Sequence, residues 1–256
     1  MKTHLIILGC GSSLGVPRAD GYWGLCDRKN LKNYRTRCSA LVKRGTNNIL
    51  IDTSPDLRSQ LLKNYINDIS YVLYTHQHAD QTHGINDLRV FYFKNKKKIN
   101  IFANKKTLDY LKKTFTYCFK EKLGYPPIVK PNLLKKKFSL GKANQSISFQ
   151  SLEVNHGVIN SIGFIIKNSA YISDCKQLSK SNINRLKNLK YFIIDCLRFS
   201  SHPSHFSLQE VLDIVKVLKP KKTILTNLHS DLDYGYLLKK TPRDVIPAYD
   251  GLKLQL

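Results

Sequence analysis

The sequence predicts an α/β (α+β) layered fold, because short apolar runs alternate with turn residues and with longer amphipathic stretches. The chain has 256 residues, of which 42% are hydrophobic, so it can enclose a substantial core. It contains no linker, internal repeat or low-complexity tract long enough to divide it. We therefore expect one domain over residues 1–256.

Ten apolar runs are predicted to be strands, because they have the length and the β-branched or aromatic content typical of strands. In chain order they are residues 4–8, 38–43, 48–52, 71–74, 99–103, 146–154, 162–166, 170–173, 191–194 and 223–225. The first run is shorter than the hydrophobic region of a signal peptide, which has about 7 to 15 residues. No run approaches the roughly 18 apolar residues of a membrane span.

Two helix starts have capping signals. Ser54, Pro55 and Asp56 suit the N-cap, the first helical position and the first turn, so a helix is predicted to begin there. A second helix is predicted over residues 207–218, because Ser207 and Glu210 have capping-box spacing.

The chain is strongly basic, with a formal net charge of +24. Residues 94–142 contain 15 lysines and only two acidic residues, Asp109 and Glu121. Such a region attracts phosphates, nucleotides or RNA. However, Lys, Asn and Ile are abundant throughout, as A+T-rich codon bias would produce, and no aromatic-rich RNA-binding motif accompanies the lysines. We favour codon bias and leave nucleic acid open as a partner.

The six cysteines indicate a reducing compartment, so we expect a cytoplasmic protein. They form no C-x-x-C pair and have no regular spacing, which argues against a disulfide framework or a zinc ribbon. They are Cys10, Cys26, Cys38, Cys118, Cys175 and Cys196.

A His-x-His-x-Asp motif follows the predicted strand 71–74. Imidazoles at alternate positions, His76 and His78, can converge on one metal ion at the end of a strand. Asp80, two residues further, can reach a second ion close by. The sequence therefore predicts half of a metal site, with a solvated polar turn as the alternative.

Four further segments place similar side chains after strands or before a helix. Each alone is weak evidence, since His beside Gly and Asp after a strand are common in turns. The segments are 154–157 with His156, 171–174 with Asp174, 201–205 with His202 and His205, and 225–229 with Asn227 and His229.

In this order, the segments resemble the metallo-β-lactamase superfamily, specifically its phosphodiesterase branch. That branch includes the phosphoribosyl cyclic phosphate phosphodiesterase of phosphonate breakdown and, more distantly, ribonuclease Z. The resemblance runs nearly end to end and includes residues 8–13, 15–18, 23–24, 35–37, 51–58 and 247–251. It implies a four-layer αββα metallo-β-lactamase sandwich, with metals at the rim between two sheets.

The resemblance implies that His76, His78 and His156 bind a first metal ion, and that Asp174 bridges it to a second. All four residues are present. Three imidazoles and one carboxylate suit zinc, which lowers the pKa of a bound water and thereby supplies hydroxide.

The second ion would be held by Asp80, Asp174 and the residues at positions 81 and 227. The family motif has histidines at those two positions, whereas this chain has Gln81 and Asn227. An amide oxygen is a harder and weaker donor than imidazole, and suits Mg²⁺ or Mn²⁺ better than zinc. We predict one firmly bound Zn²⁺ and a second position that is weak, vacant or taken by Mn²⁺ or Mg²⁺. His83 and His229 remain open as replacement ligands.

Catalytic roles follow from the same resemblance. Asp80 and His205 are the catalytic candidates, with His205 as a general acid that protonates the leaving alkoxide and His202 as its competitor. The candidates for substrate binding are Arg37, Arg58, Arg198 and His202. Structural ion pairing of these arginines with buried carboxylates such as Asp52 or Asp195 is the alternative.

The predicted function is a metal-dependent hydrolase, a phosphodiesterase acting on a small cyclic phosphate or nucleotide-like phosphodiester. The depleted second site predicts slower turnover than in dinuclear relatives. The alternatives are a non-catalytic descendant that binds nucleotide, RNA or a partner, and a tRNA-processing endonuclease, although the long arm of ribonuclease Z is absent. We expect no membrane partner and leave a homodimer open.

Overall fold

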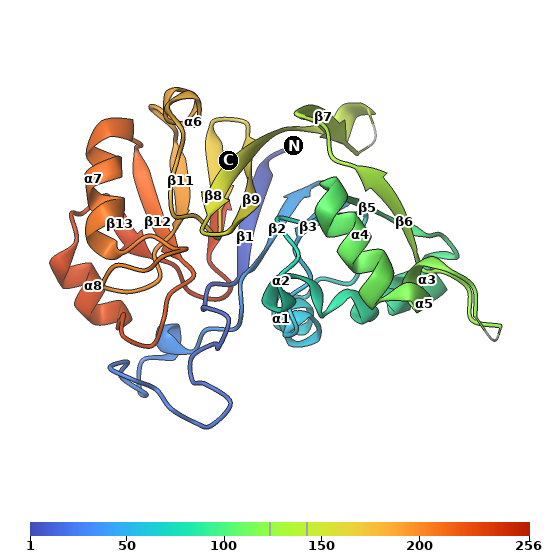
Figure 1. Ribbon diagram of the computed structural model, residues 1–256, viewed down its shortest axis with the longest axis horizontal. Coiled ribbons are helices and arrows are strands. Elements are labelled where there is room, and N and C mark those ends of the chain that lie inside the picture. Colours follow the sequence, from blue (N-terminus) through green and yellow to red (C-terminus); the bar gives the residue numbers. More distant parts are fainter. Residues whose placement is uncertain (123, 142) are drawn as a thin grey trace.

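The computed structural model describes residues 1–122, 124–141 and 143–256, and arranges them in four layers (Figure 1). The first sheet has the order β14 (Lys253–Gln255), β1 (Thr3–Gly9), β2 (Ser39–Arg44), β3 (Asn47–Ile51), β4 (Tyr71–Leu73), β5 (Ile99–Ala103), β6 (Val129–Leu133). The second has the order β13 (Val245–Pro247), β12 (Lys222–Thr226), β11 (Tyr191–Asp195), β10 (Ser169–Ile172), β9 (Ile159–Ile166), β8 (Ile147–His156), β7 (Lys137–Leu140).

Helices cover the outer face of each sheet. Those on the side of the first sheet are α1 (Leu57–Lys63), α2 (Ala79–Thr82), α3 (Arg89–Asn95), α4 (Lys105–Thr114) and α5 (Thr116–Phe119). Those on the side of the second are α6 (Lys180–Arg185), α7 (Leu208–Leu218) and α8 (Tyr234–Lys240). In the described ranges, short 3-10 helices occur at Leu31–Asn33, Ile85–Leu88 and Ala143–Gln145. None of the described helices is long and apolar enough to cross a membrane.

Both faces of each sheet are buried, which explains why the strands read as continuous apolar runs. In β1, Leu5 and Ile7 belong to the core between the two sheets, whereas Ile6 and Leu8 pack with the helices of the first sheet. In β11, Ile193 faces the central core, and Phe192 and Ile194 face the helical side. The predicted αββα sandwich is therefore confirmed.

Each of the ten predicted runs overlaps one strand, and the largest difference is at β9, which begins at Ile159 rather than at residue 162. The helix predicted at Ser54 begins at Leu57, because residues 54–56 form a turn in which Ser54 Oγ accepts from the Asp56 N–H at 3.1 Å. The helix predicted over 207–218 has its capping box, with Ser207 and Glu210 capping each other.

The ends of the strands define where polar residues meet. β3 and β4 are parallel, as are β10, β11 and β12, so the carboxyl ends of each group lie at one edge of their sheet. Residues 74–80, Asp174 and Asn227 follow these ends, and Asp195 is the last residue of β11. In open α/β sheets this edge is the usual location of a ligand site.

Asp250 connects the two ends of the chain. Its carboxylate accepts the backbone N–H of Cys10 at 3.1 Å and the N–H of Thr36 at 2.8 Å. The hydroxyl of Thr36 donates to the same carboxylate at 2.6 Å. This carboxylate thus holds the long segment between β1 and β2 against the turn that precedes β14.

Replacing Asp250 by alanine is expected to lower the free energy of unfolding by on the order of 2 to 4 kcal/mol, because two backbone donors lose their acceptor. Denaturant unfolding measures the change. The control is Asp244→Ala at an exposed position, expected to change stability by less than about 0.5 kcal/mol. Equal stability of the two variants would contradict this role of Asp250.

Candidate metal centre and active site

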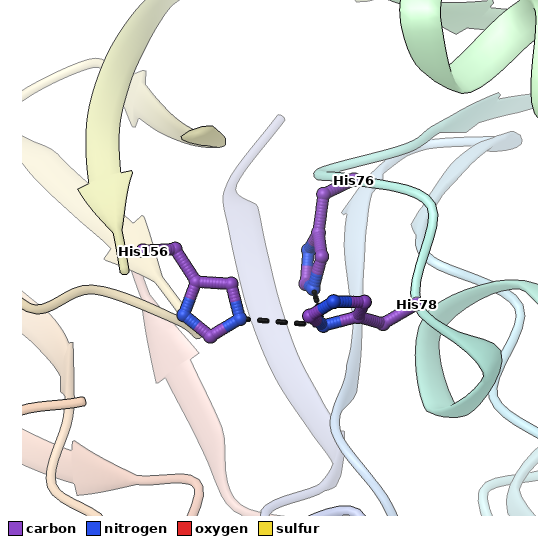
Figure 2. A group of neighbouring side chains, drawn as sticks. All are labelled: His76, His78 and His156. Carbon is purple, nitrogen blue, oxygen red and sulfur yellow. Dashed lines mark hydrogen bonds between the residues drawn. The ribbon is translucent and has the colours of Figure 1, made fainter. Parts of the chain in front are cut away.

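Three imidazole nitrogens converge on one point at the rim between the sheets (Figure 2). Nε2 of His76 lies 2.9 Å from Nδ1 of His78, and Nε2 of His156 lies 3.3 Å from the same nitrogen. Four ligands at zinc–nitrogen distances of about 2.0 to 2.1 Å in a tetrahedron are about 3.3 Å apart. The spacing of the three nitrogens therefore fits the coordination sphere of one zinc ion.

Neighbouring groups set the tautomers that metal binding requires. Nδ1 of His156 lies 2.8 Å from the carbonyl oxygen of Ser204, which can only accept, so Nδ1 bears the proton and Nε2 presents a lone pair. Thr75 Oγ1 donates to Asp52 at 2.9 Å, so at 2.9 Å from Nδ1 of His76 it accepts from that nitrogen. His76 consequently presents its Nε2 lone pair as well.

Two carboxylates complete this part of the rim. Asp174 is buried, and one of its oxygens lies within 4.8 Å of ligand nitrogens of both His156 and His205. Burial, followed by repulsion from Asp174, raises the pKa of Asp80 to about 6. Burial would raise the pKa of Asp174 too, but the imidazoles of His76, His156 and His205 hold it below its usual value. Such a pair of carboxylates attracts a cation.

Two buried amides stand where the resemblance expects two further histidines. Nε2 of Gln81 donates to Asp80 at 3.0 Å and lies 3.4 Å from Asp174. Nδ2 of Asn227 donates to Asp195 at 3.0 Å and lies 3.5 Å from Asp174. Oε1 of Gln81 is buried and has no hydrogen-bond partner among the described residues. The amides thus direct N–H groups, rather than metal-binding oxygens, at the carboxylates.

His205 is paired with a carboxylate that the sequence analysis treated only as a structural candidate. Its Nδ1 lies 2.7 Å from Oδ2 of the fully buried Asp195. Burial lowers the pKa of His205, but Asp195 more than offsets this effect, and the pKa rises to about 9. Burial raises the pKa of Asp195 itself to about 6. At neutral pH the pair is an imidazolium and a carboxylate.

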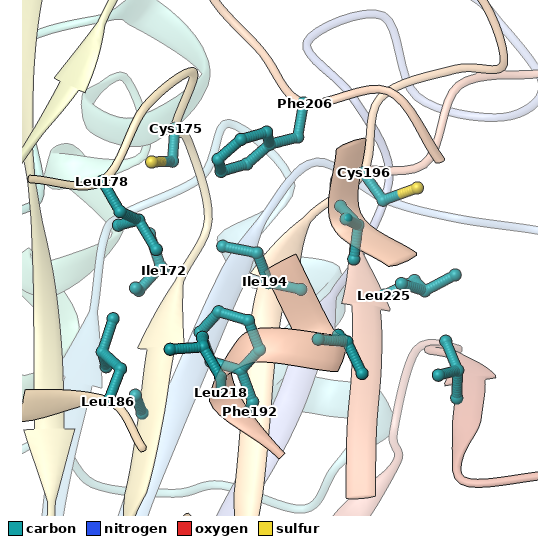
Figure 3. Close-up of a cluster of buried hydrophobic side chains, with 14 of the residues drawn as sticks. Ile172, Cys175, Leu178, Leu186, Phe192, Ile194, Cys196, Phe206, Leu218 and Leu225 are labelled. Atoms are coloured by element: carbon teal, nitrogen blue, oxygen red, sulfur yellow. The ribbon is translucent and has the colours of Figure 1, made fainter. Parts of the chain in front are cut away.

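Each functional residue of the second sheet is followed by a buried apolar anchor. Asp174, Asp195, His205 and Asn227 precede, respectively, Cys175, Cys196, Phe206 and Leu228. All four anchors belong to the core between the second sheet and α7, and Figure 3 shows the first three of them. Each buried anchor fixes the backbone beside its polar neighbour, and Asp174, His205 and Asn227 line the pocket at the rim.

The rim residues line a pocket with a volume of about 330 Å³. Leu14 and Leu197 are its apolar lining residues, and Ser12 contributes a buried hydroxyl that has no partner among the described residues. The other lining residues are Ser13, His78, Asp80, His156, Asp174, Arg198, His202, Ser204, His205, Asn227 and His229. The pocket therefore suits a small polar ligand.

The predicted substrate-binding residues are not all at this pocket. Arg198 lines it, although its guanidinium already donates to the carbonyls of Ser200 and Ser201. Arg37 forms an ion pair with Asp56, and Arg58 lines a different cavity, between α1 and α3.

His202 lines the pocket, but it differs from His205 in its hydrogen bonds. Its Nδ1 accepts from the backbone N–H of Ser204 at 3.2 Å, and burial lowers its pKa. The neutral ring of His202 is therefore less suited than His205 to donate a proton.

The two open replacement ligands lie apart from the converging nitrogens. His83 contacts the hydroxyl of Tyr110 at 3.2 Å and the ring of Phe115. His229 lines the pocket, with Nδ1 3.2 Å from Asp231. Neither belongs to the groups of metal-competent atoms found among the described residues.

Sequence analysis did not assign Thr75, Asp195 or Ser204 to the site. For Asp195 a signal was present, since it ends an apolar strand next to the one before Asp174. Thr75 and Ser204 gave no such signal, because their roles depend on which ring nitrogen each contacts.

Comparison with known proteins assigns the family. The family model described as "Beta-lactamase superfamily domain" matches residues 47–227. A crystal structure of a new diphosphatase from the PhnP family has a TM-score of 0.91 and 30% identity, covering 100% of this chain and 98% of that one. Zn²⁺-bound PqqB from Methylobacterium extorquens has a TM-score of 0.80 and 16% identity, covering 99% of this chain and 100% of that one, and supports the fold alone.

A curated relative is longer than this chain. The octanoyltransferase of Porphyromonas gingivalis (strain ATCC BAA-308 / W83) is 29% identical over 252 residues, which are 97% of this chain and 50% of that protein. The chain thus spans about half the length of this relative. The family model, the two-sheet fold and the 30% identity together establish that the chain belongs to the β-lactamase superfamily.

Proposed function

We propose that this protein is a metal-dependent hydrolase that cleaves a small cyclic phosphate or nucleotide-like phosphodiester. The observation that carries the proposal is the convergence of the nitrogens of His76, His78 and His156. His78 and His156 line one pocket together with Asp174 and His205. The similarity to a diphosphatase of the PhnP family supports phosphate-ester chemistry.

The donor set suits one zinc ion. His76, His78, His156 and Asp174 would hold it, because His76 and His156 present Nε2 lone pairs and the neighbouring imidazoles hold the pKa of Asp174 below its usual value. When bound, zinc lowers the pKa of a water ligand and polarises a phosphoryl oxygen. The second position fits zinc poorly, because Gln81 and Asn227 direct N–H groups at its carboxylates.

The chain's own groups have distinct tasks in this proposal. Asp195 holds Nδ1 of His205, which leaves Nε2 to donate a proton to the leaving oxygen. The hydroxyl of Ser12 and the guanidinium of Arg198 line the pocket, where they can bind phosphate oxygens. Asn227 donates an N–H to Asp195, and so helps to hold the carboxylate that orients His205.

The pocket favours a phosphate ester over a fatty acyl substrate. An octanoyl chain needs a continuous apolar groove, whereas two leucines, Leu14 and Leu197, are the apolar residues that line this pocket. The name of the Porphyromonas gingivalis relative therefore does not supply the substrate of this site. A second candidate function is a non-catalytic protein that binds phosphorylated ligands. It is favoured by the amides of Gln81 and Asn227, which donate N–H groups to carboxylates at the second metal position.

Turnover of bis(p-nitrophenyl) phosphate tests the hydrolase proposal. We expect p-nitrophenol release that is lost after chelation with EDTA and restored by adding Zn²⁺, because the centre supplies the nucleophile. Release measured by absorbance is the readout. No turnover with Zn²⁺, Mn²⁺ or Mg²⁺ would replace the hydrolase with the non-catalytic candidate.

His205→Gln is expected to lower kcat by about 10²- to 10⁴-fold, because the leaving oxygen loses its proton donor. Metal content measured by mass spectrometry should stay unchanged, since Nδ1 of His205 is paired with Asp195 and the three converging imidazoles remain in this variant. His202→Gln is the matched control and should keep kcat within a few-fold. Equal losses in the two variants would argue against His205 as the acid.

Replacing Gln81 and Asn227 together by histidine is expected to raise the bound metal from one ion per chain to two. The rate should rise by at least about tenfold, because a second ion stabilises the reacting oxygens. Metal content of the purified proteins is measured independently of turnover. Two zinc ions bound with comparable affinity by the unaltered protein would contradict this account of the second position.

A further inference from the structure

A cluster of exposed aromatic rings and cations lies on the basic region, away from the rim. We call it the Arg89 patch, and define it as the surface formed by Arg89, Phe93, Lys96, Tyr117, Lys120, Lys122 and Tyr125. These residues come from α3, from α5 and from the segments that follow each helix. The patch lies on the side of the molecule away from α7 and α8 (Figure 1).

Arg89 lies at the centre of this patch. Its guanidinium carbon is 5.0 Å from the ring centre of Tyr125 and 5.7 Å from that of Phe93. Lys96 Nζ lies 6.0 Å from the same Phe93 ring. The backbones of Lys122 and Tyr125 are hydrogen-bonded to each other, which keeps these two residues together. Arg89 and Lys96 therefore share one cluster with the rings of Phe93 and Tyr125.

The rings of the patch are exposed instead of packed into the core. The exposed fractions are 47% for Phe93, 58% for Tyr125 and 38% for Tyr117. Exposed apolar rings that gather in one place indicate a binding surface. Their association with Arg and Lys is the combination that binds single-stranded nucleic acid, in which rings stack on bases and cations contact phosphates.

The surrounding charge has the sign that such a ligand needs. Of the two carboxylates in residues 94–142, Asp109 is already paired with Lys105 at 2.8 Å, and Glu121 is the other. The described lysines of this region are exposed, and Lys142 lies outside the described residues. The structure thus adds to the lysines the aromatic rings that the sequence analysis did not find among them.

We propose that the Arg89 patch binds single-stranded nucleic acid. Its rings stack with unpaired bases, and Lys96, Lys120 and Lys122 contact the backbone phosphates. In a duplex the bases are stacked on each other, so few base faces are free to stack on these rings, and we expect weaker binding. This binding surface does not depend on the chemistry proposed for the rim, although both involve phosphodiesters.

Fluorescence anisotropy with a labelled 20-nucleotide single strand, measured on the full chain over a range of salt concentrations, tests the proposal. Phe93→Ala with Tyr125→Ala is expected to weaken binding about tenfold or more, because stacking is lost while the charge stays the same. The matched control, Tyr65→Ala with Tyr236→Ala, removes two exposed rings elsewhere and should leave the affinity within about twofold.

A second pair of variants tests the cations. Replacing Lys96, Lys120 and Lys122 by glutamine should reduce the slope of log affinity against log salt by about 2, since each phosphate contact contributes about 0.7. The control replaces Lys187, Lys219 and Lys221, which lie on the other half of the molecule, and removes the same charge. Circular dichroism and thermal unfolding check that all variants fold.

Equal effects of the patch and control variants would overturn the proposal, as would patch-dependent binding of phosphatidylserine vesicles without binding of the oligonucleotide. Turnover of bis(p-nitrophenyl) phosphate by the patch variants should equal that of the unaltered protein. Patch variants that lose oligonucleotide binding but keep turnover therefore show that binding depends on the patch and not on the rim. If the unaltered protein binds the oligonucleotide but shows no turnover, only the proposed hydrolase is contradicted.

Discussion

The arrangement of the rim depends on carboxylates held close together inside the protein. Asp174 and Asp195 are buried, and burial together with Asp174 raises the pKa of the nearby Asp80. Ionised carboxylates in such a place are stable only with a positive partner or with several hydrogen-bond donors. The positive charge of His205 compensates the negative charge of Asp195. A metal ion held by the imidazoles beside Asp174 would compensate the remaining negative charge. The strand ends and their buried anchors maintain this charge arrangement.

The amides of Gln81 and Asn227 change how the negative charge of the carboxylates is compensated, and they do so on one side of the rim only. Each donates N–H groups to carboxylates, and a neutral donor compensates part of a negative charge without adding a full positive one. On the other side, His76 and His156 direct their Nε2 lone pairs toward the point where Nδ1 of His78 also lies. The rim is therefore asymmetric, with converging imidazole nitrogens on one side and amide hydrogen bonds on the other.

The sequence was sufficient to predict the interior of both sheets but not their borders. The ten predicted strands are the inner ones, and the four that were missed, β6, β7, β13 and β14, are the edges of the two sheets. Edge strands are short and half exposed, and β6 and β7 contain lysines, so they lack the apolar runs that identified the others.

The same limit applies to the site. The metal-ligand candidates follow apolar strands, and so His76, His78, His156 and Asp174 were accessible from the sequence. Positions such as Arg37 and Arg58 were not, because a guanidinium side chain can turn toward several partners. Arg37 contacts Asp56 instead of the pocket, and only the folded chain decides this. Hydrogen-bond partners distant in sequence, such as Ser204 for His156, depend on packing in the same way.

The carbonyl of Ser204 lies within the segment that also carries His205. Gly157, which follows His156, has φ +72°, and a Cβ there would lie 2.8 Å from Cβ of Ser204, so this close approach of the two segments requires a residue without a side chain at position 157. A bulkier residue at position 157 would push the loop outward, releasing the ring of His156 and withdrawing His205 from the pocket in one displacement. The metal binding proposed for His156 and the proton donation proposed for His205 would thereby depend on the same close contact.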